Sequence, residues 1–306
     1  MKRQLMSGLI PFLVLALLKI SPTWAQILPE NHLLYPRSAQ AIYLTGIEVL
    51  ATPNQVKRAI EHCEKPVLLC ELISSFKNSS NLSAVEEYFS NTTAQLVFLG
   101  ERHINQEIQF SLANLLPIFK KNQFEAIALE MFNHEDQFYL DQFNQGELSI
   151  EELEVILKKN WNYSSAGYLA IFQTARELNL KLLALDDRQN TTHLNFSDNL
   201  IERDRIMART LQKNLKSNPN KKIIVYTGRL HGFQSFDTQE ALTISEILKK
   251  DRPDLKTESY LFFSYREKSV IPEMRKALSP YRNLVFKSSE LSPYFDGAIL
   301  LGEPQI

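Results

Sequence analysis

The stretch Leu96-Val97-Phe98-Leu99-Gly100-Glu101-Arg102-His103 decides the fold expected for this chain. An apolar run leads into a glycine and, three residues later, into a histidine. A short buried strand with this ending is typical of an open parallel sheet, in which the carboxyl ends of the strands line the ligand crevice. The run Ile223-Ile224-Val225-Tyr226-Thr227 leads into Gly228-Arg229-Leu230-His231 in the same way. We therefore expect His103 and His231 to meet at one edge of a sheet.

Strand-like and helix-like segments alternate around these two Gly-x-x-His motifs. The expected strands are residues 96–99, 125–130, 181–185, 222–227 and 258–263. The expected helices are residues 106–121, 135–143, 150–158, 168–178, 201–216 and 239–249. This alternation predicts βαβ units, and hence an α/β fold with a central, mostly parallel β-sheet flanked by helices. Residues 283–287 and 298–301 are expected to form an edge hairpin.

The N-terminus has the pattern of a secretory signal peptide. Lys2 and Arg3 precede an apolar run from Leu9 to Leu18, and Ala25 closes a cleavage site. The run is shorter than the roughly 20 residues that a membrane span needs, although an uncleaved anchor is the alternative. We expect a signal peptide at 1–25, an additional N-terminal helical region at 26–93 and the α/β domain at 94–306. The mature protein is then periplasmic or secreted, at the cell envelope without a membrane span.

Composition and motifs exclude several classes of function. The formal net charge is −1, so the chain lacks the basic surface of a nucleic-acid-binding protein. No H-E-x-x-H, G-x-S-x-G, P-loop or G-x-G-x-x-G motif is present. The two cysteines, Cys63 and Cys70, are expected to form a disulfide in an oxidising compartment, with free thiols as the alternative. We expect a small-molecule or peptide ligand, and a homodimer is left open.

Charged side chains follow several of the expected strands. Glu101 and His103 follow the first, Glu130 ends the second, and His231 follows the fourth. Carboxylates beside imidazoles can bind a divalent metal ion, or can act as general bases in hydrolysis. Glu101, His103, Glu130 and His231 are therefore the candidate catalytic residues, and His103 and His231 are the candidate metal ligands.

Each candidate also has a structural interpretation. Glu101 is suited to capping the next helix. Glu130 closes an apolar strand and needs a partner, for which Arg102 or Arg188 would serve. The charges of residues 202–208 are typical of a solvated helix face, with a place in the site as the alternative. The aromatic group Trp161, Tyr163 and Tyr168 suits core packing or the wall of a flat apolar ligand site.

Several motifs in a fixed order resemble those of the ChaN-like haem-binding family. The wider superfamily of TraB/TIKI proteins and erythromycin esterases is also similar. The resemblance covers roughly residues 94–235. The matching pieces are Gly100-Glu101-Arg102-His103, Ala128-Leu129-Glu130-Met131-Phe132, Gln137, Leu140-Asp141, Gly146-Glu147-Leu148, Trp161, residues 168–175, residues 183–185, Arg203-Asp204-x-x-Met207-Ala208 and Gly228-x-x-His231.

This resemblance implies a parallel α/β fold and two different activities. ChaN-like members imply haem binding in iron uptake at the cell envelope, with His103, Tyr168, His231 and Arg188 as haem contacts here. TIKI-like and esterase-like members imply a hydrolase that uses the two Gly-x-x-His motifs and a glutamate, with a divalent metal ion as cofactor in the TIKI-like case. The sequence ranks the haem-binding protein first and the metal-dependent hydrolase second, so whether the chain is an enzyme is left open.

Overall fold

The computed structural model describes residues 82–103, 105–194, 196–232, 234, 242–264, 283–287 and 295–301. All of them belong to one compact unit, Tyr35–Ile306. The expected signal peptide, most of the expected N-terminal helical region, and Cys63 and Cys70 lie outside the described residues. Within the described part of the chain, no helix is both long and apolar enough to cross a membrane.

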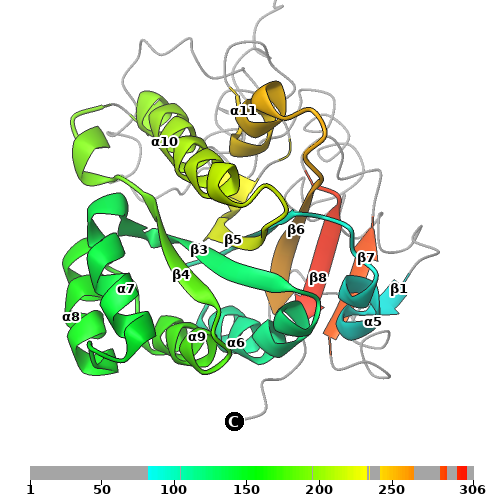
Figure 1. Ribbon diagram of the computed structural model, residues 1–306, viewed down its shortest axis with the longest axis horizontal. Helices are drawn as coiled ribbons and strands as arrows, with labels where there is room; N and C mark the ends of the chain where they lie inside the picture. Colours follow the sequence, from blue (N-terminus) through cyan, green and yellow to red (C-terminus); the bar gives the residue numbers. More distant parts are fainter. Residues whose placement is uncertain are drawn as a thin grey trace, which may run out of the picture. The chain divides into compact units, whose positions relative to one another are not determined.

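One sheet of eight strands forms the centre of this unit (Figure 1), with the strand order β1-β7-β8-β6-β2-β5-β3-β4. The six strands from β8 to β4 are parallel to their neighbours, and β7 is antiparallel to both β8 and β1. The predicted central, mostly parallel sheet is therefore confirmed. The strands are β1 (Leu82–Ala84), β2 (Leu96–Glu101), β3 (Phe124–Asn133), β4 (Lys181–Asp186), β5 (Lys222–Gly228), β6 (Thr257–Ser264), β7 (Asn283–Lys287) and β8 (Gly297–Leu301).

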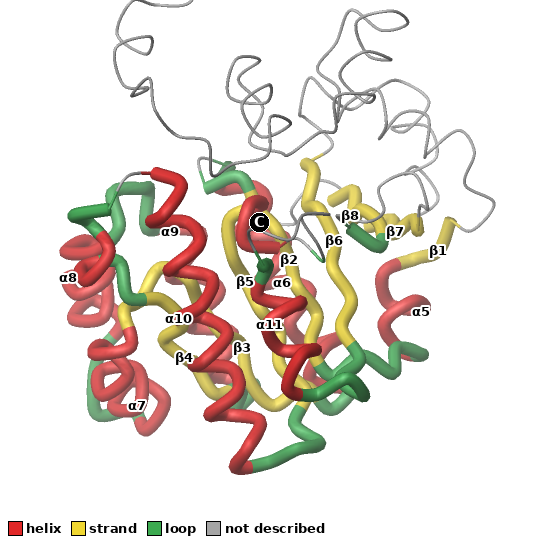
Figure 2. The backbone as a smooth tube through the Cα atoms, turned by 90° about the horizontal axis from the view of Figure 1, so that it is seen from above, coloured by secondary structure: helices red, strands yellow, loops and turns green. Residues whose placement is uncertain are grey.

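Helices cover both faces of the sheet (Figures 1 and 2). Alternate residues of a strand point to opposite faces, and the core is divided accordingly. Val97 and Leu99 pack in the cluster that contains α5, α6, α7, α8 and α9, whereas Leu96 and Phe98 pack in the cluster that contains α10 and α11. The helices are α5 (Val85–Ser90), α6 (Gln106–Lys121), α7 (Gln137–Gln145), α8 (Ile150–Asn160), α9 (Ala166–Glu177), α10 (Phe196–Ser217) and α11 (Ile244–Asp251).

The start of α11 and the edge of the sheet differ from the sequence-based expectation. Helix α11 begins at Ile244 rather than at residue 239, because Thr243 and Glu246 form a capping box: the Glu246 N–H donates to Thr243 Oγ1, and the Thr243 N–H donates to Glu246 Oε2. The predicted hairpin of β7 and β8 does form, but it is not the edge of the sheet. The outermost strand on that side is β1, whose pairing with β7 had no sequence signal.

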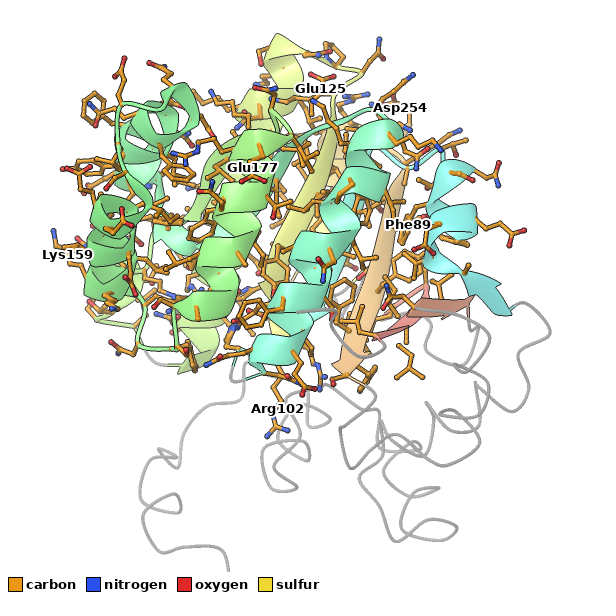
Figure 3. All side chains as sticks on the ribbon, turned by 90° about the horizontal axis from the view of Figure 1, so that it is seen from below. Phe89, Arg102, Glu125, Lys159, Glu177 and Asp254 are labelled. Carbon is orange, nitrogen blue, oxygen red and sulfur yellow. The ribbon has the colours of Figure 1, made fainter. Side chains whose placement is uncertain are left out.

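The strand order explains how distant residues reach one site. Strands β2, β5, β3 and β4 lie side by side, so their carboxyl ends meet at one edge of the sheet. The register pairs Glu101 of β2 with Gly228 of β5, and Leu129 of β3 with Tyr226 of β5. Figure 3 shows Arg102 at this edge, at the opposite end of the sheet from Glu125 and Asp254. Ligand sites in open α/β sheets form at this carboxyl edge.

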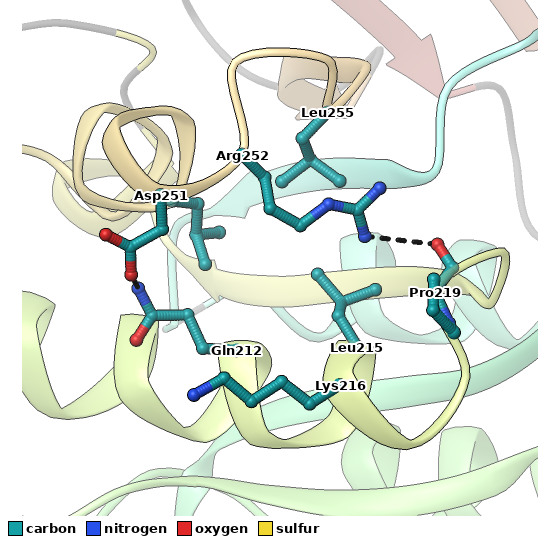
Figure 4. A pocket seen from close by; sticks show the side chains of 8 residues that line it. Gln212, Leu215, Lys216, Pro219, Asp251, Arg252 and Leu255 are labelled. Atoms are coloured by element: carbon teal, nitrogen blue, oxygen red, sulfur yellow. Dashed lines mark hydrogen bonds between the residues drawn. The ribbon is translucent and has the colours of Figure 1, made fainter.

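A cavity of about 350 Å³ lies near the amino edge instead (Figure 4). It is lined by the last turns of α10 and α11 and by Pro219 and Leu255, which precede β5 and β6. Two hydrogen bonds cross its rim, from Gln212 to Asp251 at 2.6 Å and from Arg252 Nη1 to the Pro219 carbonyl at 3.1 Å. None of the predicted site residues lines this cavity.

Candidate active site at the carboxyl edge

Glu101 ends β2 and is the centre of the first group of side chains. The Tyr168 hydroxyl, from α9, donates to Glu101 Oε1 at 2.5 Å, and the Tyr226 hydroxyl, from β5, donates to Oε2. Burial and the nearby Glu101 raise the pKa of both phenols, so both keep the protons that they donate. The carboxylate is itself 1% exposed. It is therefore fixed in orientation, with Oε1 shared between Tyr168 and His103.

His103 lies directly on this fixed carboxylate. Its Nδ1 is 2.9 Å from Glu101 Oε1. Because both oxygens of Glu101 already accept hydrogen bonds from tyrosines, Glu101 is the acceptor here too, so Nδ1 carries the proton and Nε2 is left to exchange protons. Burial lowers the pKa of His103, but the hydrogen bond to Glu101 and the charge of Glu130 outweigh burial and raise the pKa above 6.5. The imidazole is thus a base stronger than a free histidine.

Aromatic rings hold the other sides of the imidazole. The centroid of the His103 ring lies 4.8 Å from the Trp161 ring, in an edge contact, and 5.0 Å from the Tyr163 ring. Trp161 is buried and Tyr163 is exposed, while the His103 side chain keeps 17% of its surface accessible. The amide of Gln109 donates to the His103 carbonyl at 3.0 Å and holds the backbone of this segment. The aromatic group therefore serves as core at Trp161 and as site wall at Tyr163.

Glu130 is the centre of the second group and lies within β3. Arg203 Nη2 donates to Glu130 Oε1 at 2.6 Å, and Arg188 Nη2 donates to the same oxygen at 3.1 Å. The Gly228 N–H donates to Oε2 at 2.5 Å. Burial alone would raise the pKa of Glu130, but the side chains around it, including both guanidinium groups, hold this pKa well below its ordinary value. Glu130 is therefore a permanent buried anion.

His231 follows β5, in the short helix η3 (Arg229–Gly232), and is buried on Asp204 of α10. The distance from His231 Nδ1 to Asp204 Oδ1 is 2.5 Å. Burial raises the pKa of Asp204 well above its ordinary value, while burial and Arg203 lower the pKa of His231 well below its own. The pair therefore shares one proton and stays neutral. Asp204 Oδ2 is buried without a hydrogen-bond partner among the described residues.

The two histidines lie on opposite oxygens of Glu130. His103 Nε2 is 3.9 Å from Oε2, and His231 Nε2 is 3.6 Å from Oε1. The sequence-based expectation that these histidines approach one site agrees with this geometry. A divalent cation does not suit the donor set, because two guanidinium groups, those of Arg188 and Arg203, bind Oε1 of the carboxylate between the imidazoles, and the Gly228 N–H binds Oε2. Among the described residues, no three His, Cys, Asp or Glu side chains are arranged to hold a metal ion.

The glycines of the two Gly-x-x-His motifs allow the strands to approach each other. A Cβ on Gly228 would lie 2.7 Å from His103 Nε2, and a Cβ on Gly100 would lie 3.2 Å from the Arg229 Cα. A Cβ at Gly228 would therefore clash with the first motif, and a Cβ at Gly100 would make a tight contact with the second. The pairing of Gly100 with Thr227 and of Glu101 with Gly228 fixes this close approach.

Replacing Gly228 with alanine is therefore expected to displace the His103 ring from Glu101. A crystal structure of the variant would show this displacement, because the new methyl group would also lie 2.9 Å from His103 Cε1. Gly232→Ala is the matched control, since its Cβ would make only ordinary contacts, the nearest at 3.5 Å from the Gly100 Cα. An unchanged distance of 2.9 Å between His103 and Glu101 in Gly228→Ala would contradict the expectation.

The structure brings some of the predicted residues together and gives others a different environment from the expected one. Glu101, His103, Glu130 and His231 converge, and Arg188 pairs with Glu130, as one structural interpretation of Glu130 required. Tyr168 is close as well, but it is fully buried and its hydroxyl is bound to Glu101. The expectation of a solvated face at residues 202–208 is wrong for Arg203 and Asp204, which are buried in the site. Nothing in the sequence marks Tyr226 as a site residue, because a tyrosine in an apolar strand usually packs in the core.

The fold and site thus define an α/β protein with a buried carboxylate–histidine cluster at the carboxyl edge of its sheet. Residues 90–194 match the model of the protein family described as "Haem-binding uptake, Tiki superfamily, ChaN". The predicted resemblance to the ChaN-like family is therefore confirmed for these residues, which include Glu101, His103, Glu130, Tyr168 and Arg188. No curated protein sequence matches the chain at a significant level.

Several solved structures are similar to this chain. The type III effector HopBA1 has a TM-score of 0.48 and 11% identity, and the match covers 75% of this chain and 99% of that one. A mutant of the erythromycin esterase EreC in its open conformation has a TM-score of 0.47 and 14% identity, with 68% and 90% covered. ChaN of Campylobacter jejuni, with cofacially bound haem, has a TM-score of 0.40 and 15% identity, with 60% and 86% covered. The chain spans less than half the length of the bacterial toxin chains that it also resembles.

Proposed function

We propose that the protein is a hydrolase in which His103 is the general base, and Glu101 orients this imidazole and makes it more basic. The single observation that carries this proposal is the Glu101 carboxylate, which is buried, accepts hydrogen bonds from two tyrosines and lies 2.9 Å from His103 Nδ1. A carboxylate that fixes the tautomer of an imidazole leaves the opposite nitrogen ready to take a proton from water. Because the His103 side chain is partly exposed, water can serve as the attacking group.

The proposed step moves one proton. As the water oxygen bonds to the carbonyl carbon of an ester or amide, Nε2 of His103 takes one water proton. When the bond from that carbon to the leaving oxygen or nitrogen breaks, the imidazolium returns the proton to the leaving group, and the acyl part is released as the carboxylic acid. His103 must be neutral to begin. Since its pKa is raised, the neutral fraction and hence the rate rise with pH through a value above 6.5 and fall on the acid side. Glu130, His231 and Asp204 hold the surrounding geometry.

Haem binding is the second candidate, and two observations favour it. The family that residues 90–194 match is described by haem-binding uptake, and the partly exposed His103 lies between aromatic rings at the site surface. His103 and Arg188 are the predicted haem contacts with accessible surface. Tyr168 and His231 would first have to leave Glu101 and Asp204, so a role for them as axial ligands stays a prediction.

One sample of purified protein tests both candidates. Hydrolysis of 4-nitrophenyl acetate is followed by nitrophenolate absorbance, and haemin is titrated into a second aliquot while the Soret band is recorded. Saturable hydrolysis without a saturable Soret shift is the expected result for the hydrolase. A saturable Soret shift at a fixed stoichiometry, with no hydrolysis above the buffer rate, would replace the hydrolase by the haem-binding protein.

Export and the domain division complete the proposal. The signal-peptide pattern of residues 1–25 supports secretion or a periplasmic location. In the mature chain, the end of the N-terminal region proposed at 26–93 contributes β1 and α5 to the sheet and core of the α/β domain proposed at 94–306. Mass spectrometry of the protein expressed with its own N-terminus tests export directly. A mature chain beginning at Gln26 is expected, and an intact Met1 in the cytoplasmic fraction would contradict export.

A further inference from the structure

Arg203 and Arg188 both bind the carboxylate of Glu130, but they differ in their number of hydrogen bonds and in their exposure to solvent. Arg203 donates to Glu130 at 2.6 Å and, through Nε, to Asp186 Oδ2 at 2.9 Å, and its side chain is 10% exposed. Arg188 makes one hydrogen bond in this group, to Glu130 at 3.1 Å, and its side chain is 31% exposed. Its Nε is buried 3.4 Å from Asp186 Oδ2, so the N–H groups that it can still offer to a ligand are those of Nη1 and the second N–H of Nη2. Arg203 therefore satisfies the buried acids, while Arg188 has donor capacity left.

Arg188 is held in a defined position beside the proposed base. Its backbone N–H donates to Asn133 Oδ1 at 2.9 Å, which fixes the chain after β4. Its guanidinium stacks over the Trp161 ring at 4.1 Å, and the same ring contacts His103 at 4.8 Å. A planar guanidinium stacked on an aromatic face keeps its hydrogen-bonding edge free and ordered. The tryptophan thus positions Arg188 and His103 as neighbours.

The negative charges of the site are buried, and its basic side chains lie nearer to solvent. The carboxylates of Glu101, Glu130 and Asp186 are each at most 1% exposed and bonded to donors within the protein. Arg188 and His103 are more exposed than the other basic side chain of this group, with 31% and 17% of their side-chain surfaces accessible against 10% for Arg203. The described side chains thus place a cationic and aromatic surface toward solvent, with the negative charge beneath it.

We propose that Arg188 binds an anionic group of the substrate, a carboxylate or a phosphate, next to the bond that is cut at His103. The inference rests on the proposed hydrolase, because it names the class of substrate that this site would take. An oxyanion accepts the remaining N–H groups of the guanidinium in the fork geometry that arginine offers, and charge-assisted bonds of this kind are strong. Arg188 is then the residue that determines specificity, and His103 performs the chemistry.

The test compares a charged and a neutral ester with the same leaving group. Mono-4-nitrophenyl succinate carries a free carboxylate, whereas 4-nitrophenyl acetate does not. Arg188→Gln is expected to lower the ratio of their kcat/KM values by about tenfold or more, which is the usual weight of one charged hydrogen bond. Arg188→Lys, which keeps the charge but loses the fork, should lower the ratio less.

Arg252→Gln is the matched control, because Arg252 also pairs with a carboxylate and is exposed to a similar extent, 29%. Arg252 lies by the cavity at the amino edge, far from the proposed anion site (Figure 4). The ratio of the two kcat/KM values in Arg252→Gln should therefore equal the wild-type ratio. A ratio that stays within twofold of wild type in Arg188→Gln would overturn the inference.

A second readout keeps the inference testable if neither ester is hydrolysed, an outcome that counts against the proposed function alone. Succinate and inorganic phosphate are titrated at fixed pH while the imidazole resonance of His103 is followed by NMR. A saturable shift in the wild type that is lost in Arg188→Gln supports the anion site, and the anion that saturates first identifies the group as carboxylate or phosphate. No saturable shift with either anion would overturn the inference.

Discussion

Replacing His103 with asparagine is expected to lower kcat/KM for 4-nitrophenyl acetate by about 10³-fold, within the range that general acid–base catalysis contributes. Asparagine retains a hydrogen bond donor toward Glu101 but has no nitrogen that takes a proton from water. The protein should stay folded, because the His103 ring lies at the site surface rather than in the core. Steady-state hydrolysis, measured together with the thermal unfolding midpoint, separates loss of the base from loss of the fold.

His134→Asn is the matched control for this substitution. His134 begins the short helix after β3, its side chain is 50% exposed, and it lies 3.4 Å from Asp187 rather than from Glu101 or Glu130. Its kcat/KM should remain within about twofold of the wild-type value. Equal activity in His103→Asn and in the wild type would remove His103 from the mechanism.

Glu130→Gln is expected to lower the free energy of unfolding by about 3 kcal/mol, since removing one partner of a buried ion pair leaves the opposite charge uncompensated. Arg203 and Arg188 would lose a shared anion, and the Gly228 N–H would lose a charged acceptor. Urea denaturation at neutral pH gives this difference directly. Because the pKa of Glu130 is lowered in the folded protein, its stabilisation is present above the ordinary value of 4.5 and is lost as the pH falls below it.

Glu125→Gln provides the same chemical change on the same strand. Glu125 lies near the start of β3 with an exposed side chain, at the end of the sheet opposite to the site (Figure 3). Its effect on the free energy of unfolding should be within about 0.5 kcal/mol, as for most surface substitutions. If the two variants unfold at the same urea concentration, the Glu130 network does not stabilise the fold as proposed.

The parallel sheet was predictable because its signals are local. Each central strand is an apolar run of five or so residues bounded by polar ones, and the two Gly-x-x-His motifs mark where two of the strands end. The convergence of Glu101, His103, Glu130 and His231 follows from the same rule, since residues at carboxyl ends of adjacent parallel strands share one edge. The family match over residues 90–194 agrees with this interpretation.

The buried partners of these residues were not predictable in the same way. Arg203 and Asp204 lie within a run of charges, and Glu202 and Arg205 of that run form a surface ion pair at 3.2 Å. Which pair faces inward depends on the rotation of α10 against the sheet, which only the packed core of Met207, Ala208 and Leu211 fixes. Tyr226 was equally hidden, because its ring packs as core while its hydroxyl alone reaches Glu101.

The pKa of His103 tests the central claim most directly, because the claim is that Glu101 makes this imidazole a stronger base. An NMR titration of the His103 Cε1–H resonance, assigned with the His103→Asn variant, measures it without any substrate. The account predicts a value above 6.5 in the wild type and a lower value in Glu101→Gln, in which the carboxylate charge is gone but burial remains. A value at or below 6.5 in the wild type, or an equal value in the two proteins, would contradict the account.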